Sequence, residues 1–453
     1  MRLFGTDGLR GRAGVFPLDG ASLFQIGREL GRRVRAAGRP RVVLGGDTRE
    51  STRGMIARLA GGLSESGCGV ASAGVMTTPG IAELVLACRA GAGVSVSASH
   101  NPYEDNGVKI FGPDGRKWPD ADEQSLEESL LASQGSAVAT LRDADRMPEA
   151  EEDVAAPPVD PKLAETYLGH LASYMPAHLD GLAVVVDAGN GAAFALGPAA
   201  LTRAGARVTA MSVEPDGRNI NHGCGALHPE GMARRTRETG AAMGVALDGD
   251  ADRSIFSDEA GRILDGDDVL WIVAHEWKRQ GRLAVGGVVG TVMSNFGLEA
   301  ALAREGIAFH RAAVGDRNVA RLMEETGATI GGETSGHVLL SLSPAGDGIL
   351  TCLTLARILS EKGGKLSRLA TLEKVPQSLR NVKAARRVPL EEVPALQAAT
   401  RHAEKVLDGR GRVFLRYSGT EALLSILVEG LDEKEVLAVA EELEAVAKRA
   451  LPH

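Results

Sequence analysis

Residues 21–46 read ASLFQIGRELGRRVRAAGRPRVVLGG, and this stretch decides the fold class. Its first half places apolar residues on one face of a helix, at Leu23, Ile26, Leu30 and Val34. The Gly-Arg-Pro turn at 38–40 then breaks the chain before the apolar run Val-Val-Leu at 42–44, which is typical of a buried strand. A helix that leads into a buried strand is the repeating element of α/β proteins. We therefore predict an α/β fold.

The same rhythm returns further along the chain. Strand-like runs followed by turn and helix signals begin at 184–187 and 288–292, so we expect about three comparable units in a chain of 453 residues. The segment 148–161 is acidic, contains prolines and lacks periodicity, which makes it the best linker candidate. A second boundary is expected near 362–365, before a small final domain. That domain ends in an amphipathic helix whose apolar face comprises Val436, Val439, Ala440, Leu443, Val446 and Ala447.

The composition argues against several classes of protein. The net charge is −8, whereas a nucleic-acid or anionic-membrane partner would require a basic surface. The sequence contains no run of about 18 apolar residues and no apolar signal segment near Met1. The four cysteines are scattered without CxxC spacing, which argues against a disulfide framework and a zinc site. We expect a cytoplasmic protein.

The segment DGDADR at 248–253 is the most informative for chemistry, and it follows a strand-like run at 243–246. Its three carboxylates, at alternate positions, repel one another by about 4 kcal/mol per pair at ~4 Å and an effective dielectric of ~20. A bound cation would reverse the sign of that energy. Oxygen-only ligands suit Mg²⁺, which readily completes its octahedron with phosphate oxygens. The segment therefore predicts a magnesium site.

Two other interpretations of this segment fit less well. In an EF-hand, Glu259 would be the twelfth ligand, but Arg253 occupies the glycine position and strands flank the loop. In a haloacid-dehalogenase-like phosphatase, Asp248 would be the nucleophile of a DxDxT motif, but Asp252 stands where the threonine should be. An exposed acidic turn without a metal also stays open.

A second segment, VSVSASHNP at 94–102, is an alternating strand that runs into a polar turn. Such a turn exposes a hydroxyl at a strand end, although Ser99 alone would more often be a turn or cap residue. His100 alone is an equally weak signal. The following segment, 105–112, places Lys109 on a short strand nearby. A lysine beside a reacting hydroxyl can serve as general acid or base if its pKa is lowered.

Two further loops are candidates for ligand binding. The glycine-hinged loop 331–337 carries Glu333, Ser335 and His337 at alternating positions, which suits the hydroxyls of a sugar. The segment RYSGTE at 416–421 offers a guanidinium, two hydroxyls and backbone amides that can surround a phosphate.

Taken in order along the chain, five motifs resemble the α-D-phosphohexomutase family: GTDGLRG at 5–11, ASHNP at 98–102, DGDADR at 248–253, GETSGH at 332–337 and RYSGTE at 416–421. The resemblance spans the whole chain. Within the family, GTVMSNFGLE at 290–299 and VGDR at 314–317 are most similar to the bacterial phosphoglucosamine mutases.

This resemblance implies an α/β protein of four domains, with three related α/β/α units with mixed sheets around a central cleft and a smaller C-terminal α+β domain. We expect a phosphoserine domain at 1–152, a metal-binding domain at 153–256, a sugar-binding domain at 257–370 and a phosphate-binding domain at 371–453.

The resemblance also implies a role for each matching residue. Catalysis would fall to Ser99, as the phosphorylated carrier, and to Arg10, Lys109 and His100. The metal would be held by Asp248, Asp250 and Asp252 against the phosphate of Ser99. The sugar would be bound by Arg253, Glu333, Ser335 and His337. The phosphate that is not reacting would be held by Arg416, Ser418, Gly419 and Thr420.

The implied activity interconverts glucosamine 6-phosphate and glucosamine 1-phosphate, with Mg²⁺ and a glucosamine (or other hexose) 1,6-bisphosphate intermediate, and supplies UDP-N-acetylglucosamine for cell-wall synthesis. A small hexosamine phosphate is the expected partner, without nucleic acid or membrane, and a homodimer is compatible with the sequence. Five positions depart from the subfamily pattern: Thr334, Tyr417, Ala422, Ser425 and Asn318. Three alternatives stay open: a phosphomannomutase or phosphoglucomutase with the same mechanism, a metal-dependent phosphatase, and a non-catalytic sugar-phosphate sensor.

Overall fold

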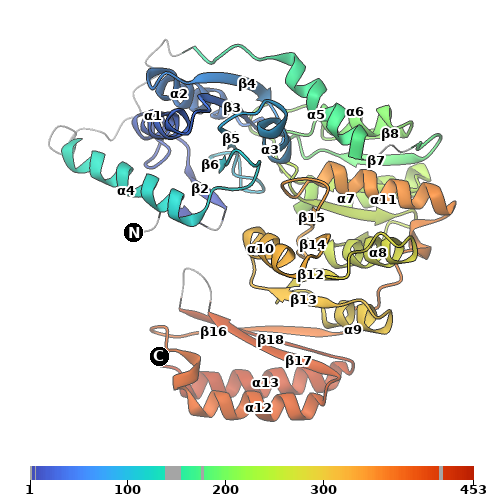
Figure 1. Cartoon of the computed structure of the whole chain (residues 1–453). Coiled ribbons are helices and arrows are strands. Elements are labelled where there is room, and N and C mark those ends of the chain that lie inside the picture. The colour runs from blue at the N-terminus through green and yellow to red at the C-terminus, as the bar shows by residue number, and fades with distance from the viewer. Residues whose placement is uncertain (1–2, 6, 138–154, 175–177, 418–421, 453) are drawn as a thin grey trace.

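The computed structural model describes residues 3–5, 7–137, 155–174, 178–417 and 422–452. Its strands form four separate sheets that follow one another along the chain (Figure 1). No helix among these residues is long and apolar enough to cross a membrane.

The first sheet has six strands in the order β1-β2-β6-β5-β3-β4. Its strands are β1 (Phe4–Gly5), β2 (Gly8–Arg12), β3 (Arg41–Gly46), β4 (Gly69–Val75), β5 (Ala92–Val96) and β6 (Asp105–Phe111). Its helices are α1 (Gly20–Ala36), α2 (Thr52–Glu65), α3 (Thr78–Ala87) and α4 (Asp120–Ala137). The predicted helix and strand at 21–46 are confirmed as α1 and β3. Helix α1 begins where the Asp19 carboxylate accepts a 2.9 Å hydrogen bond from the Ser22 amide.

The second sheet has the order β11-β10-β9-β7-β8, and the third has the order β13-β12-β14-β15. The second comprises β7 (Ala183–Asp187), β8 (Arg207–Met211), β9 (Met243–Leu247), β10 (Ser254–Asp258) and β11 (Ile263–Leu264). The third comprises β12 (Val288–Thr291), β13 (Phe309–Ala312), β14 (Ile330–Gly332) and β15 (Val338–Leu340). The helices between these strands and around them are α5 (Pro161–Tyr174), α6 (Leu196–Arg203), α7 (Glu230–Thr239), α8 (Gly266–Arg279), α9 (Phe296–Arg304), α10 (Asp316–Thr326) and α11 (Gly348–Lys362).

These three sheets share one topology. In each, three parallel strands are followed along the chain by a strand that returns antiparallel to the third. The loop at that return lies between β5 and β6, between β9 and β10, and between β14 and β15. Each of these loops carries one of the predicted motifs, at residues 97–104, 248–253 and 333–337. The prediction of three related α/β units with mixed sheets is therefore confirmed.

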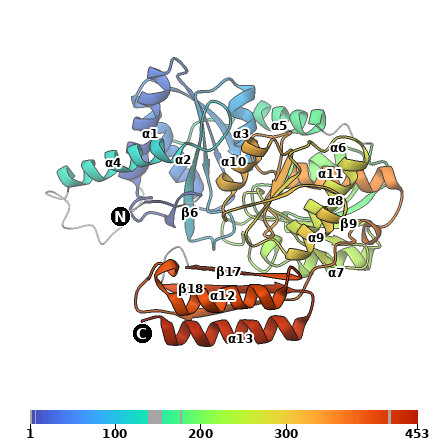
Figure 2. The same ribbon diagram turned by 60° about the horizontal axis from the view of Figure 1, so that its bottom comes forward.

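The last sheet is smaller and fully antiparallel, in the order β16-β18-β17. It consists of β16 (Gln377–Lys383), β17 (Gly411–Tyr417) and β18 (Leu423–Gly430), and helices α12 (Pro394–Leu407) and α13 (Glu433–Ala450) cover the face turned away from the other sheets (Figures 1 and 2). Its apolar core is separate from that of the other three units. The predicted amphipathic helix is confirmed as α13, which buries five of the six predicted residues and half-buries Val446.

The domain boundaries proposed above stay predictions. Part of the expected linker, 148–154, lies outside the described residues. The strand β11 follows the expected boundary at 256 and pairs with β10 of the second sheet.

Candidate active site

The turn that carries Ser99 has a strained backbone. Ser99 has φ of 54°, in the left-handed region that costs a non-glycine residue about 1–3 kcal/mol. Three hydrogen bonds hold it there: its amide donates to Ser97 Oγ at 2.9 Å, and its carbonyl accepts from Asn221 Nδ2 at 2.9 Å and Arg49 Nη2 at 3.1 Å. The turn is therefore positioned by the second sheet as well as by the first.

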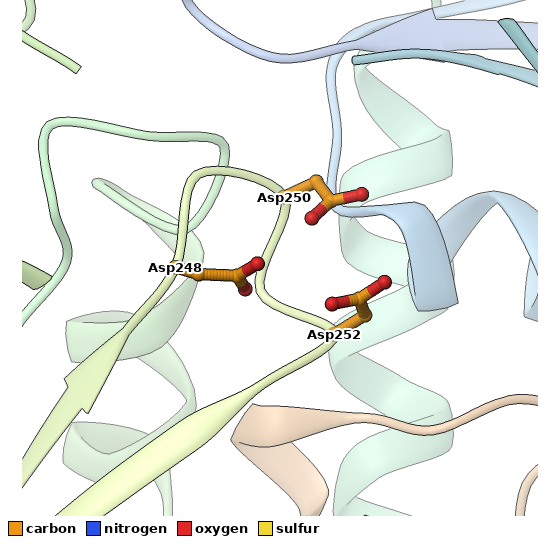
Figure 3. Close-up of side chains that lie close together, drawn as sticks. All are labelled: Asp248, Asp250 and Asp252. Atoms are coloured by element: carbon orange, nitrogen blue, oxygen red, sulfur yellow. The ribbon is translucent and has the colours of Figure 1, made fainter. Parts of the chain in front are cut away.

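The acidic loop 248–253 brings its three carboxylates together, as Figure 3 shows. One oxygen from each of Asp248, Asp250 and Asp252 can be chosen so that all lie within 4.8 Å of one another, and all three side chains are buried. The Ser99 hydroxyl donates a hydrogen bond to Asp248 Oδ2, across 149 positions in the sequence. The structure thus places the predicted carrier hydroxyl directly against the predicted metal ligands.

The donor set fits a magnesium ion. Asp250 Oδ1 and Asp252 Oδ1 are buried and have no hydrogen-bond partner among the described residues, so each has a free lone pair in the interior. Burial raises the pKa of Asp248 well above its usual value, and the charges of Asp252 and Asp250 raise it further. Like charges held this close are stabilised by a hard divalent cation, and the three carboxylates offer only oxygen.

Lys109 contributes a compensating positive charge to this cluster. Its Nζ lies 2.8 Å from Asp250 Oδ2, 3.0 Å from Asp252 Oδ2 and 2.9 Å from Asp7 Oδ2. Burial alone would lower the pKa of Lys109, but the three carboxylates raise it well above its usual value. A role as general acid or base requires a lowered pKa, so this arrangement holds the lysine as a cation.

His100 also contacts the carrier hydroxyl. Its Nδ1 is 3.3 Å from Ser99 Oγ and 3.2 Å from Arg253 Nη1. Burial lowers the pKa of His100 to about 4, and the positive charges of Arg253 and Arg10 act in the same direction. The imidazole is neutral at pH 7. Since a guanidinium can only donate, Nδ1 is the acceptor and Nε2 carries the proton.

His337 joins the acidic loop to the third sheet. Its Nδ1 lies 3.7 Å from Asp252 Oδ1 and its Nε2 lies 3.8 Å from Asp316 Oδ2. Burial would lower the pKa of His337, but these two carboxylates raise it. The two carboxylates therefore stabilise the imidazolium form of His337 relative to a histidine in solvent.

The predicted residues outside this cluster lie as follows. Arg10 pairs with Asp7 and makes no described contact with Ser99. Glu333 Oε1 accepts from the amide of Gly315 at 2.8 Å, and Ser335 is exposed at the tip of its loop. Arg416 is exposed near the end of β17. Ser418, Gly419 and Thr420 lie outside the described residues.

Sequence reasoning missed several residues that shape this site. Thr78 donates from Oγ1 to Asp250 Oδ2 at 2.6 Å and from its amide to the Asp250 carbonyl at 3.0 Å. Arg49 is paired with the buried Asp47, which also accepts from Ser97. Asp7 lies inside the GTDGLRG motif, so the sequence could have suggested it as a site residue. Thr78 is an isolated threonine at the start of a helix, and nothing in the local sequence distinguishes it as a site residue.

The chain matches four domain descriptions in order: the phosphoglucomutase/phosphomannomutase α/β/α domains I, II and III at residues 1–135, 165–261 and 265–375, and the C-terminal domain of the same family at 379–446. The chain belongs to this family.

Its similarity to individual members of the phosphoglucomutase/phosphomannomutase family is also extensive. A curated relative from Anaeromyxobacter sp., named phosphoglucosamine mutase, is 44% identical and covers 99% of this chain and 96% of its own. The crystal structure of a phosphoglucomutase/phosphomannomutase family protein from Burkholderia thailandensis has a TM-score of 0.80 at 23% identity, covering 100% of this chain and 99% of its own. The expected family, fold and enzyme class, an isomerase, are confirmed.

An N-acetylphosphoglucosamine mutase from Aspergillus fumigatus, solved in complex with GlcNAc-6P and magnesium, has a TM-score of 0.68 at 17% identity and covers 99% of this chain and 96% of its own. The enzyme was also solved as a variant in complex with glucose 1,6-bisphosphate. At this identity the likeness shows the shared fold.

Proposed function

We propose that the protein interconverts glucosamine 6-phosphate and glucosamine 1-phosphate by way of a phosphorylated Ser99. One observation carries the proposal: the Ser99 hydroxyl lies on a carboxylate of the Asp248-Asp250-Asp252 cluster, with the Lys109 ammonium inside the same cluster. Phosphoryl transfer depends on alignment and on neutralising charge around the moving group. The name of the curated relatives at 42–44% identity supports glucosamine as the sugar.

The reaction requires a balanced exchange of bonds and protons. In the first half-reaction the bond between phosphorus and Ser99 Oγ breaks while a bond to the free sugar hydroxyl forms, and the proton of that hydroxyl passes to the serine oxygen. In the second half-reaction the bond between the other phosphorus and its sugar oxygen breaks while a bond to Ser99 Oγ forms, and the serine proton passes to the sugar oxygen. Neutral His100, with Nδ1 3.3 Å from Ser99 Oγ, is placed to accept the proton of the serine hydroxyl, and Lys109 supplies a fixed positive charge beside the acidic cluster. The resulting 1,6-bisphosphate turns over in the site before it returns its other phosphoryl group.

We assign the remaining residues to the metal and the ligand. Asp248, Asp250 and Asp252 would hold Mg²⁺, which supplies charge neutralisation at the phosphoryl oxygens when it is bound. Glu333, Ser335, His337 and Arg253 would bind the sugar, and Arg416 with Ser418, Gly419 and Thr420 would hold the second phosphate. The magnesium in the Aspergillus fumigatus complex supports the metal, and the position of the 333–337 loop in the common topology supports the sugar site.

The departures from the subfamily pattern have structural roles of their own. Tyr417 Oη accepts from the amide of Val388 at 3.4 Å. Ser425 Oγ donates to Asn381 Oδ1 at 2.8 Å, and Asn318 Nδ2 donates to the Val314 carbonyl at 3.0 Å. None of these contacts involves the cluster around Ser99, so they give no reason to expect a non-catalytic sensor. The net charge of −8 agrees with a cytoplasmic enzyme of small molecules that needs neither nucleic acid nor membrane.

An activity assay tests the proposal directly. The purified protein with Mg²⁺ and a trace of hexose 1,6-bisphosphate is given glucosamine 6-phosphate, mannose 6-phosphate or glucose 6-phosphate, and both the 1-phosphate and free phosphate are measured. We expect the fastest conversion with glucosamine 6-phosphate and little free phosphate. A preference for mannose or glucose would indicate the rival mutases, and stoichiometric phosphate release would indicate a phosphatase.

The carrier is tested separately with Ser99→Ala. This variant removes the only oxygen at that position that can carry the phosphoryl group, so turnover should be abolished while the thermal unfolding temperature stays close to that of the wild type. Intact-mass measurement should show one phosphoryl group on the wild type that resists hydroxylamine and that the variant lacks. A fully active variant, or a label lost to hydroxylamine, would exclude the serine carrier.

A further inference from the structure

The VGDR motif at 314–317 has no role in the chemistry described so far. Its last two residues, Asp316 and Arg317, are the first residues of α10, and their opposite charges both contact the first unit. Arg317 Nη1 donates to Asp120 Oδ1 at 2.6 Å and to Glu123 Oε2 at 2.8 Å. Asp316 forms an ion pair with Lys117. The start of α10 is thus fixed to residues 117–123 by three ion pairs: Arg317 supplies the cation in two, and Asp316 supplies the anion in the third.

Lys117 has a second partner that reaches into the active site. Its Nζ contacts Asp7 as well as Asp316, and its side chain is only 12% exposed. Asp7 in turn contacts Arg10 and lies 2.9 Å from Lys109 Nζ. Lys117 therefore ties α10 to the carboxylate that holds the active-site lysine.

These contacts close into a ring of acidic and basic side chains that joins all three related units. In order, the ring comprises Lys109, Asp252, His337, Asp316, Lys117 and Asp7. The first, fifth and sixth members come from the first unit, the second from the loop after β9, and the other two from the third unit. Acidic and basic side chains alternate around the ring, so removal of one member leaves each of its two neighbours with one partner fewer.

We propose that Lys117 is a positioning residue for phosphoryl transfer: it holds Asp7 against Lys109 and Arg10, and it makes this alignment depend on the docking of α10. The inference rests on the proposed function. Lys117 makes no described contact with Ser99 or the acidic triplet, so its effect is transmitted through Asp7. A displacement of about 1 Å at a reacting group costs roughly 100-fold in rate, which sets the scale of the effect.

The test compares Lys117→Met, Lys117→Arg and the control Lys362→Met in the full-length protein. Lys362 is also a partly buried lysine, with Nζ 2.9 Å from Glu276 Oε2, but it lies on α11 outside the ring. We expect Lys117→Met to lower kcat about 10- to 100-fold while KM for glucosamine 6-phosphate changes less than about threefold. Lys117→Arg should recover most of the loss because it keeps both ion pairs. Lys362→Met should keep the wild-type kcat.

A second readout does not depend on turnover. Acetylation of Lys109 by a small anhydride, followed by peptide mass mapping, reports whether its ammonium is still enclosed. Labelling should rise severalfold in Lys117→Met but not in Lys117→Arg or Lys362→Met. Asp316→Asn leaves the contact between Lys117 and Asp7 in place, so it should lower kcat less than Lys117→Met does. The double variant Asp316→Asn/Lys117→Met should have about the same kcat as Lys117→Met alone.

Several outcomes would overturn the proposal. A kcat and a Lys109 labelling in Lys117→Met equal to those of the wild type would do so. A fall in kcat that is the same in Lys117→Met and Lys117→Arg, and that parallels the fall in their unfolding temperatures, would also do so. If the wild type itself fails to convert glucosamine 6-phosphate, the proposed function fails, and the labelling of Lys109 alone then decides the role of Lys117.

Discussion

The chain contains the tripeptide Asp-Gly-Asp at 248–250 and again at 265–267, and the two copies have different structural environments. The first follows β9, where its carboxylates converge on one another and on Asp252. The second opens α8, where the Asp265 carboxylate accepts from the amide of Asp267 at 3.0 Å and Asp268 Oδ2 accepts from the amide of Asp265 at 3.1 Å. The second copy is a capping box, in which the helix start supplies the donors.

The charges of the two copies are also compensated differently. Lys374 Nζ lies 2.7 Å from Asp265 and 2.6 Å from Asp268, so the helix start has a lysine of its own as well as the helix dipole. In the first copy, Lys109 is shared with Asp7, and the three carboxylates converge on one another instead of on backbone donors. An acidic tripeptide therefore forms a stable helix cap where backbone amides and a lysine of its own compensate its charges. Without them, the same residues form the carboxylate cluster that we propose as the cation site.

The largest difference between the two copies should appear on removal of one charge from the triplet. Asp250→Asn keeps the shape and the contacts with Thr78 but removes a ligand charge. We expect kcat to fall at least about 100- to 1000-fold because charge neutralisation at the phosphoryl group is weakened. The thermal unfolding temperature measured without metal should not fall, since a buried repulsion is relieved.

Metal dependence provides the check on this prediction. Added Mg²⁺ should raise the unfolding temperature of the wild type, by mass action on the folded state, and should raise that of Asp250→Asn much less. An equal rise in both proteins would show that the triplet does not bind the ion.

Local pattern predicted the parts of the site that a few neighbouring residues determine. The alternating carboxylates, the serine turn and the three-fold rhythm of strands are all visible within short windows, and the structure contains all of them. The contacts between units could not be predicted in this way. Lys117 and Asp316 belong to the first and third units, and only the packing of these units brings them together. The raised pKa of Lys109 could not be predicted either, because it depends on Asp7 and on the acidic loop of another unit.

A smaller effect is expected at the glycine of the second copy. A Cβ on Gly266 would lie 1.9 Å from the carbonyl oxygen of Glu333, and the Gly266 amide donates to the Thr334 carbonyl at 3.1 Å. Gly266→Ala should therefore displace the 333–337 loop and cost about 1–3 kcal/mol of unfolding free energy. If that loop binds the sugar, KM for glucosamine 6-phosphate should rise as well.

The matched control is Gly231→Ala. A Cβ at Gly231, within α7, meets nothing within 4 Å, so this change should leave KM unaltered and should stabilise the helix by up to about 1 kcal/mol. Equilibrium unfolding in urea and initial-rate kinetics measure both quantities. A wild-type KM in Gly266→Ala together with a loss of stability would place the sugar site away from this loop.

The smallest effect should follow loss of the cap itself. Asp265→Ala removes the acceptor for the first amides of α8 and one partner of Lys374, which should cost about 0.5–2 kcal/mol of unfolding free energy. Asp265→Asn should recover most of that loss, because asparagine caps a helix about as well as aspartate. The Mg²⁺-dependent rise in unfolding temperature should be the same in both variants and in the wild type. A reduced rise in Asp265→Ala would mean that the second tripeptide also contributes to cation binding, and the division between a cap and a cation site would then be wrong.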